Sequence, residues 1–252
     1  MPLLAGAHTS GSVLDVPQSE ARRGPLHEDH EALGAKFGDF AGWLMPLEFD
    51  GGGVLAEHSA VRQRVGLFDV SHMGTFVVSG SGAKDGLNEV FTNDLNRISA
   101  GQAQYSLLCN ERGGVIDDVF VYLAADDRII VVPNAANASI VIGTVERVLE
   151  SSDVRVEDRS KSTAIIAVQG PASQQVIEAV GLPGDLDYLR FVELETDNGH
   201  VLAARTGYTG ERGYELLVDA AAAQYWWGQL RLHAEALGGR PCGLGGRDTL
   251  RT

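Results

Sequence analysis

The stretch QYSLLCNERGGVIDDVFVYL, residues 104–123, contains two apolar runs separated by a pair of glycines. Gly113 and Gly114 predict a turn, and flanking runs rich in Val, Leu, Phe and Tyr are typical of β-strands. We therefore expect a hairpin with strands at residues 104–110 and 115–124. Because strands joined by a short turn run antiparallel, this segment favours an antiparallel sheet.

Side chains along the second strand point alternately to its two faces. One face carries Val115, Asp117, Val119 and Val121, and the other carries Ile116, Asp118, Phe120 and Tyr122. The two aspartates are therefore expected to lie at different sites. A carboxylate among aromatic rings needs a hydrogen-bond donor, which a flat polar heterocycle bound at Asp118 would supply. Alternatively, the aspartates lie at a strand edge or pair with arginines, and spacing alone leaves both interpretations open.

Helices and strands come in blocks along the chain, without a strict βαβ rhythm. Further strands are predicted at residues 76–78, 128–133, 164–169, 201–205 and 214–218. Helices are predicted at residues 25–37, 54–65, 136–149, 173–180 and 220–237, and the opening of another at Arg247. Residues 41–53 are predicted to form a glycine-rich loop. The predicted fold class is α+β, with antiparallel sheets and packed helices.

Composition narrows the classes of function. The chain has 252 residues, with 20 Lys and Arg against 34 Asp and Glu, and a formal net charge of −14. No basic cluster is present, so nucleic acid is not an expected partner.

No apolar run approaches the length of a membrane span, and residues 1–24 are predicted to be a flexible leader without a secretory signal. Cys109 and Cys242 are isolated, which favours a reducing compartment, the cytoplasm.

The segment RTGYTGERGYE, residues 205–215, is a second candidate site. Its glycines recur at every third position and permit either a plain hairpin turn or close approach of the backbone to a ligand. Tyr208 and Glu215 lie on either side of this turn.

Elsewhere, His27 and His30 have helical spacing, but no third ligand motif follows, so no metal site is predicted. His72 is predicted to be a hydrogen-bonded structural or pocket-lining residue.

Eight blocks, taken in order, resemble the aminomethyltransferases of the glycine cleavage system, known as T proteins. The blocks are AGWLMPLEF, GLFDVSHMG, FTNDL, QYSLLCNERGGVIDDVFVYL, VVPNAAN, AVQGP, RTGYTGERGYELL and GLGGRDTLR. The resemblance implies a tetrahydrofolate-dependent transferase. In this family a partner, H protein, carries an aminomethyl group on its lipoyl arm. Tetrahydrofolate accepts the one-carbon unit, and ammonia and dihydrolipoyl H protein are released.

The resemblance also implies roles for individual residues. The family's catalytic aspartate is the second of its Asp-Asp pair, which is Asp118 here. The residues implied to bind folate are Tyr105, Tyr122, Asn134, Tyr208, Glu215 and Arg247. Among these, Glu215 would accept pterin N–H groups and Arg247 would pair with a carboxylate of the folate tail.

The family's architecture implies two interleaved lobes of a three-lobed molecule over residues 25–252. Lobe one would span residues 25–75 and 160–252, and lobe two residues 76–159, and by this resemblance the family's C-terminal β-rich lobe would be missing. Three alternatives stay open. The chain could be a folate-binding module without transferase activity, the folate-accepting region of a dimethylglycine or sarcosine oxidase, or an inactive truncated fragment.

Overall fold

The computed structural model describes residues 21–150 and 153–251, and it confirms the α+β class with antiparallel sheets and packed helices. Most of the predicted leader, residues 1–20, lies outside the described residues. Within its described end, the Arg22 amide donates to Gly42 and the Arg22 carbonyl accepts from Leu44. None of the helices in residues 21–150 and 153–251 combines the length and apolarity needed to cross a membrane.

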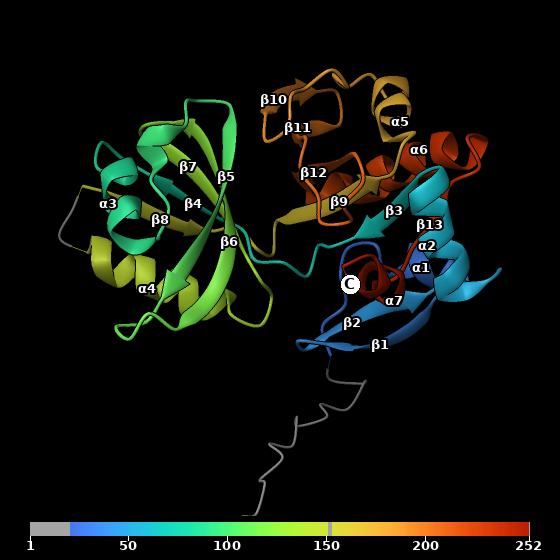
Figure 1. The fold of residues 1–252 in the computed structure, drawn as a ribbon, viewed down its shortest axis with the longest axis horizontal. Helices are drawn as coiled ribbons and strands as arrows, with labels where there is room; N and C mark the ends of the chain where they lie inside the picture. Colours follow the sequence, from blue (N-terminus) through green and yellow to red (C-terminus); the bar gives the residue numbers. More distant parts are fainter. Residues whose placement is uncertain (1–20, 151–152, 252) are drawn as a thin grey trace, which may run out of the picture.

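A five-stranded antiparallel sheet forms one half of the molecule (Figure 1). Its strands, in spatial order, are β5 (Gln102–Cys109), β6 (Val115–Ala125), β7 (Arg128–Pro133), β4 (Phe76–Ser79) and β8 (Arg155–Asp158). Helices α3 (Ala83–Val90) and α4 (Ala138–Leu149) cover its outer face, and η1 (Leu95–Arg97) precedes β5. The predicted hairpin is β5 and β6, with Gly113 at a positive φ of 77° in its turn.

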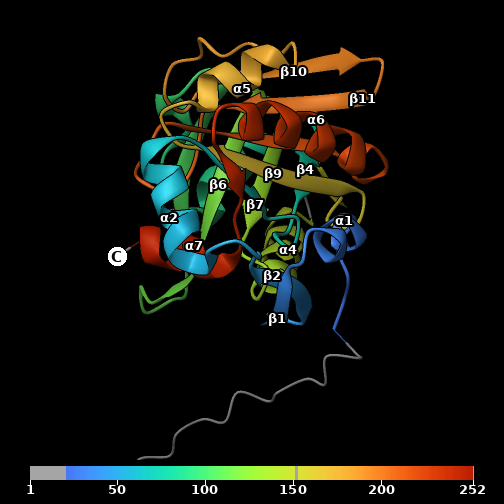
Figure 2. The ribbon, with the colours of Figure 1, turned by 90° about the vertical axis from the view of Figure 1, so that its right-hand side faces the viewer.

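A six-stranded sheet forms the other half. Its order is β10 (Phe191–Thr196), β11 (Gly199–Ala204), β12 (Gly213–Asp219), β9 (Thr163–Gln169), β3 (Gly66–Asp69) and β13 (Arg240–Pro241). The β3–β13 pair is parallel, whereas the other pairs are antiparallel. Helices α5 (Ser173–Ala179) and α6 (Ala223–Ala236) cover one face, with η2 (Ala220–Ala222) leading into α6 (Figure 2).

The faces of the two sheets that the helices leave uncovered meet each other. One apolar cluster contains Tyr122 and Ile130 from the five-stranded sheet together with Ile165, Leu202 and Leu217 from the six-stranded sheet. The other two clusters each join one sheet to its own helices. The junction between the sheets is therefore the place where residues from distant parts of the sequence come together.

The N-terminal region differs from its prediction. The helix predicted over residues 25–37 is only α1 (His27–Ala32), because Gly34 takes a positive φ of 72° and turns the chain. The next residues form a hairpin of β1 (Lys36–Phe40) and β2 (Trp43–Glu48), where the end of that helix and a glycine-rich loop are predicted. Ala41 and Gly42 both have positive φ angles, which is the geometry of a two-residue hairpin turn.

Two further helices pack near this hairpin. Helix α2 (Gly53–Gln63) lies at the predicted position, and α7 (Leu244–Leu250) contains Arg247. The two helices lie side by side (Figure 2). The other predicted helices and strands are also present, with ends that differ from prediction by up to three residues.

Two of the glycines in residues 205–215, Gly207 and Gly213, make room for one buried side chain. A Cβ atom at Gly207 or Gly213 would lie 2.2 Å from Oε1 of Gln169. The Gln169 amide is fully buried and donates to the carbonyls of Thr206 and Tyr214, each at 3.3 Å. Glycine is therefore required at these positions for packing against β9.

We expect Gly213→Ala to lower the free energy of unfolding by about 1–3 kcal/mol, because a methyl group would displace the Gln169 amide. Urea unfolding monitored by circular dichroism measures the change. Gly228→Ala is the matched control, since a Cβ added at Gly228 in α6 would meet no other segment of the described chain within 4 Å. There alanine is expected to stabilise the protein slightly through helix propensity. Equal stability of the two variants would contradict the packing argument.

Candidate functional site

A cavity of about 410 Å³ lies between the two sheets. It is lined by all seven residues to which the family resemblance assigns a role: Tyr105, Asp118, Tyr122, Asn134, Tyr208, Glu215 and Arg247. They come from strands β5, β6 and β12, the residue after β7, the β11–β12 loop and helix α7. The tertiary structure thus brings both candidate motifs and the Arg247 helix to one place.

The Asp118 carboxylate is held by two neighbours at one wall of this cavity. Its Oδ2 accepts a hydrogen bond from the Tyr105 hydroxyl at 2.9 Å, and its Oδ1 accepts one from Nδ2 of Asn134 at 3.0 Å. Burial, followed by the hydrogen bond to Asp118, raises the pKa of Tyr105. Tyr105 therefore remains a protonated donor, and the carboxylate keeps a defined orientation.

Asp117 lies on the opposite face of β6, as the strand alternation predicts. It is buried and accepts hydrogen bonds from the Asn134 backbone amide at 2.9 Å and from Nδ2 of Asn137 at 2.8 Å. Asn134 links the two faces, because its side-chain amide lies within 3.1 Å of an oxygen of each aspartate. Asp117 therefore anchors the residue that orients Asp118, and Asp118 alone of the pair lines the cavity.

Aromatic rings form the wall beside Asp118. The centres of the Tyr105 and Phe120 rings are 5.6 Å apart, and those of Phe120 and Tyr122 are 6.1 Å apart. Burial raises the pKa of Tyr122, so its hydroxyl stays neutral. This wall suits a flat, partly polar ligand better than an extended aliphatic one.

Glu215 supplies a second carboxylate deeper in the site. It is buried, and its Oε2 accepts a hydrogen bond from the Thr206 hydroxyl at 2.5 Å. Burial raises the pKa of Glu215, while the Thr206 hydrogen bond and the positive charge of Arg247 oppose that shift. A carboxylate has about four acceptor positions, so Glu215 retains capacity for N–H donors of a ligand.

Arg247 and Tyr208 present polar atoms that have no partner within the described residues. The guanidinium carbon of Arg247 lies 4.9 Å from the centre of the Tyr208 ring, a cation–π contact. Nε of Arg247 and the Tyr208 hydroxyl are both buried without a hydrogen-bond partner among residues 21–150 and 153–251. Buried polar groups are normally hydrogen-bonded, and these two N–H and O–H donors are free to meet acceptor atoms of a ligand.

Among the lining residues that were not predicted are Tyr188, Leu189 and Arg251. Leu189 has a positive φ of 63°, which is rare outside glycine and is not readable from the sequence. Arg251 closes the block GLGGRDTLR that carries Arg247, and helical spacing from Arg247 is the signal that would have found it.

The histidines lie outside the cavity. His72 is buried against Phe40, with ring centres 5.1 Å apart, and does not line the cavity although Met73 does. The pocket-lining alternative for His72 is therefore wrong. The hydrogen-bonded alternative is wrong as well, because both ring nitrogens are buried without a hydrogen-bond partner among residues 21–150 and 153–251. Burial lowers the pKa of His72 to about 4, so its ring is neutral. Nε2 of His30 lies 2.9 Å from the buried carboxylate of Asp69.

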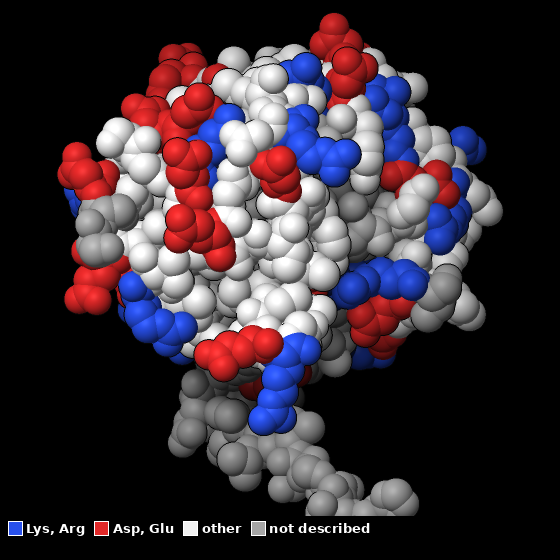
Figure 3. Space-filling model, turned by 60° about the vertical axis from the view of Figure 1, so that its left-hand side comes forward, with Lys and Arg blue, Asp and Glu red and all other residues white. Residues whose placement is uncertain are grey.

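Charged side chains are unevenly distributed over the surface. Figure 3 shows one face whose middle is occupied mainly by uncharged residues, with acidic and basic side chains around it. The formal net charge of −14 makes the protein as a whole acidic.

Comparison with known proteins connects this site to a family. Residues 26–252 match the family model described as the GCVT N-terminal domain. An aminomethyltransferase of Parafrankia sp. strain EAN1pec is 50% identical over 233 residues, which are 92% of this chain and 64% of that protein. An aminomethyltransferase of Mycobacterium tuberculosis H37Rv is 47% identical over 238 residues, 94% of this chain and again 64% of that protein. The chain thus spans about 64% of the length of these curated relatives.

Solved structures show the same fold. The crystal structure of glycine cleavage system aminomethyltransferase T from Bartonella henselae superposes with a TM-score of 0.84 at 36% identity, covering 91% of this chain and 62% of that chain. A heterotetrameric sarcosine oxidase from Corynebacterium sp. U-96 superposes with a TM-score of 0.53 at 17% identity, over 73% of this chain and 92% of that one, a likeness of fold alone. As the ordered motifs predict, the chain belongs to the family of the GCVT N-terminal domain.

Proposed function

We propose that the cavity between the sheets binds tetrahydrofolate and that the protein is an aminomethyltransferase of the glycine cleavage system. The one-carbon unit would pass from aminomethyl-dihydrolipoyl H protein to tetrahydrofolate, with release of ammonia. The observation that carries the proposal is the position of Asp118, whose oriented carboxylate lines a cavity together with aromatic rings, Glu215 and Arg247.

The shape and chemistry of the cavity suit a reduced pteridine. Its volume of about 410 Å³ lies in the ordinary range for small-molecule sites. Tyr105, Phe120 and Tyr122 would pack against the flat rings, and Glu215 would accept two N–H groups from the pterin edge. Arg247, buried without an ion pair among the described residues, would pair with an anionic group, for which the folate tail carboxylate is the strongest candidate.

The protein's part in the reaction would be orientation and electrostatics. Tyr105 and Asn134 hold the Asp118 carboxylate in one direction before the substrate arrives. Such a fixed charge stabilises positive charge that develops on the folate nitrogens during transfer, without reorganisation at the moment of reaction. The lipoyl arm of H protein would bring the aminomethyl group to the cavity, which turns the transfer into a reaction between oriented groups.

The cytoplasm is the proposed compartment. Cys109 and Cys242 are both free thiols. Cys242 directly follows strand β13 and is buried. Free cysteines without disulfides are typical of proteins kept in a reducing environment.

Two measurements test the proposed function. Titration calorimetry with tetrahydrofolate under anaerobic conditions is expected to show one saturable site, and addition of aminomethylated H protein is expected to release ammonia only when folate is present. Binding without ammonia release, at saturating H protein, would support a folate-binding module without transferase activity. Absence of both binding and release would contradict the proposal and support an inactive fragment.

A further inference from the structure

We propose that Arg62 is a positioning residue for this site, because it joins helix α7 to the loop that carries Tyr208 and so holds Arg247 against the Tyr208 ring. Arg62 lies on α2 and does not line the cavity. The inference rests on the proposed function in one respect: tetrahydrofolate is the ligand whose binding is measured in the test. The contacts themselves involve only residues of this chain.

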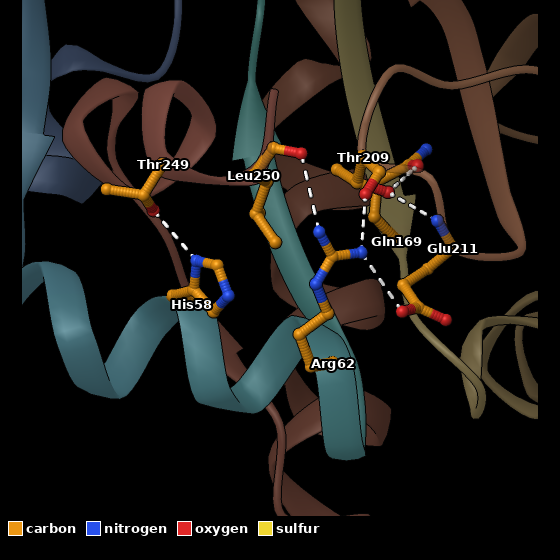
Figure 4. A network of polar contacts seen from close by, with 7 residues as sticks. All are labelled: His58, Arg62, Gln169, Thr209, Glu211, Thr249 and Leu250. Atoms are coloured by element: carbon orange, nitrogen blue, oxygen red, sulfur yellow. Dashed lines mark hydrogen bonds and ion pairs between the residues drawn. The ribbon is translucent and has the colours of Figure 1, made fainter. Parts of the chain in front are cut away.

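The Arg62 guanidinium contacts two separate segments (Figure 4). Its Nη1 donates to the Thr209 carbonyl at 2.7 Å and to Oε1 of Glu211 at 3.0 Å. Its Nη2 donates to the Leu250 carbonyl at 3.4 Å. Thr209 directly follows Tyr208, and Leu250 lies one helical turn after Arg247. One side chain therefore sets the separation between the two residues of the cation–π pair.

Helix α7 depends on such contacts for its position. It has seven residues, and isolated helices shorter than about 12–15 residues are marginal in water. Helix α2 contacts both of its ends: Oε2 of Glu57 accepts from the Gly243 amide at 2.9 Å, and Arg62 donates to Leu250. Because helix ends leave amides and carbonyls unpaired, these side chains satisfy groups that α7 cannot satisfy itself.

The loop at the other end of the contact is fixed independently. Thr209 is fully buried, and its hydroxyl donates to Oε1 of Gln169 at 2.9 Å (Figure 4). Gln169 belongs to β9, in the middle of the six-stranded sheet. The Arg62 contact with Thr209 therefore ties α7, and Arg247 with it, to the sheet that carries the cavity wall.

Arginine and lysine differ in their ability to make these contacts. The guanidinium is a planar fork with five N–H donors, whereas the ammonium of lysine is a single compact point. Lysine at position 62 would keep the positive charge but would not reach both carbonyls. The pair of variants Arg62→Ala and Arg62→Lys therefore separates the geometry of the contact from the charge that attracts an anionic folate.

The experiment measures tetrahydrofolate affinity by calorimetry in a double-mutant cycle with Arg247→Ala. Arg62→Ala and Arg62→Lys are each expected to weaken binding by about fivefold to fiftyfold in the wild-type background. In the Arg247→Ala background the same changes are expected to weaken it by less than about twofold, because a residue that acts through Arg247 has no effect once Arg247 is gone.

Arg231→Ala is the matched control. The Arg231–Glu235 ion pair measures 3.1 Å with the arginine 36% exposed, close to the 3.0 Å and 34% of the Arg62–Glu211 pair. Arg231 and Glu235 both lie on α6, so this ion pair joins no separate segments. Its removal is expected to leave folate affinity unchanged within about twofold.

A second readout needs no ligand. Hydrogen exchange of the α7 amides is expected to be at least about tenfold faster in Arg62→Ala than in wild type, and unchanged in Arg231→Ala. Wild-type binding of Arg62→Lys, equal weakening in both backgrounds, or unchanged α7 exchange would each overturn the inference. If the wild-type chain binds no tetrahydrofolate, the proposed function fails, while the exchange measurement still decides whether Arg62 positions α7.

Discussion

Replacing Asp118 by asparagine is expected to lower the rate of folate-dependent ammonia release by about 100-fold to 1,000-fold. Asparagine has nearly the same size but carries no negative charge. It would also direct an N–H₂ group toward either the Tyr105 hydroxyl or Nδ2 of Asn134, both of which donate to Asp118 in the native site. Stabilisation of developing positive charge would be lost together with the orientation of the side chain.

The rate is measured with aminomethylated H protein and saturating tetrahydrofolate, so that weaker binding does not contribute. Asp126→Asn is the control, because Asp126 follows the same strand β6 but its side chain is 80% exposed and pairs with Lys84 at the surface. It is expected to keep the wild-type rate. An Asp118→Asn protein that unfolds at the wild-type temperature and turns over at the wild-type rate would remove Asp118 from the catalytic role.

Glu215→Gln is expected to weaken tetrahydrofolate binding by about tenfold to a hundredfold. Hydrogen bonds to a charged acceptor contribute about 1.5–3 kcal/mol, and glutamine has one acceptor oxygen where the carboxylate has two. Its N–H₂ group would face an N–H of the pterin edge. Calorimetry measures the dissociation constant, and unchanged affinity would show that Glu215 does not contact the pterin.

The same substitution is expected to change how stability depends on pH. Burial is the main reason why the pKa of Glu215 is raised in the folded protein, so the folded state binds this proton more tightly than the unfolded state. The protonated Glu215 therefore makes a favourable contribution to the free energy of unfolding. This contribution is complete below the ordinary glutamate pKa of 4.5 and is lost as pH rises toward the raised pKa of the folded protein. Glutamine does not titrate, so the Glu215→Gln protein does not lose stability at this position as pH rises.

Urea unfolding of both proteins, at a series of pH values above 4.5, tests this expectation. The Glu215→Gln protein is expected to lose less stability with rising pH and to be at least as stable as wild type at pH 7. A parallel pH dependence in the two proteins would contradict a raised pKa at Glu215. The combination of weaker binding and equal or greater stability would identify Glu215 as a residue kept for function.

The fold of the central region was predictable because its determinants are local. The glycine pair after residue 112 and the alternation along β6 correctly place Asp117 and Asp118 on opposite faces. Pleating alone decides that separation, whatever the rest of the chain does.

Short elements were not predictable in the same way. Strands β3, β8, β10 and β13 and helix α3 were not predicted. Strands β3 and β8 have four residues each and β13 has two, and each becomes a strand by pairing with a partner distant in the sequence. The β1–β2 hairpin was not predicted for two reasons. Leu26, Leu33 and Phe37 lie near helical spacing, which favours a helix, and residues 41–53 are rich in glycine, which favours a loop. The positive φ of Gly34 and the pairing of Phe40 with Trp43 override that local preference.

The family, the α+β class, the face of β6 from which Asp118 projects and a set of residues that line one cavity all follow from the amino-acid sequence. Three other features are visible only in the folded protein. They are the packing of Gly207 and Gly213 against Gln169, the polar atoms of Arg247 and Tyr208 that lack partners among the described residues, and the contacts by which Arg62 connects their two segments. Turn preference and strand alternation act within a few residues, whereas cavities, unpaired atoms and bridging contacts depend on which distant segments meet when the chain folds.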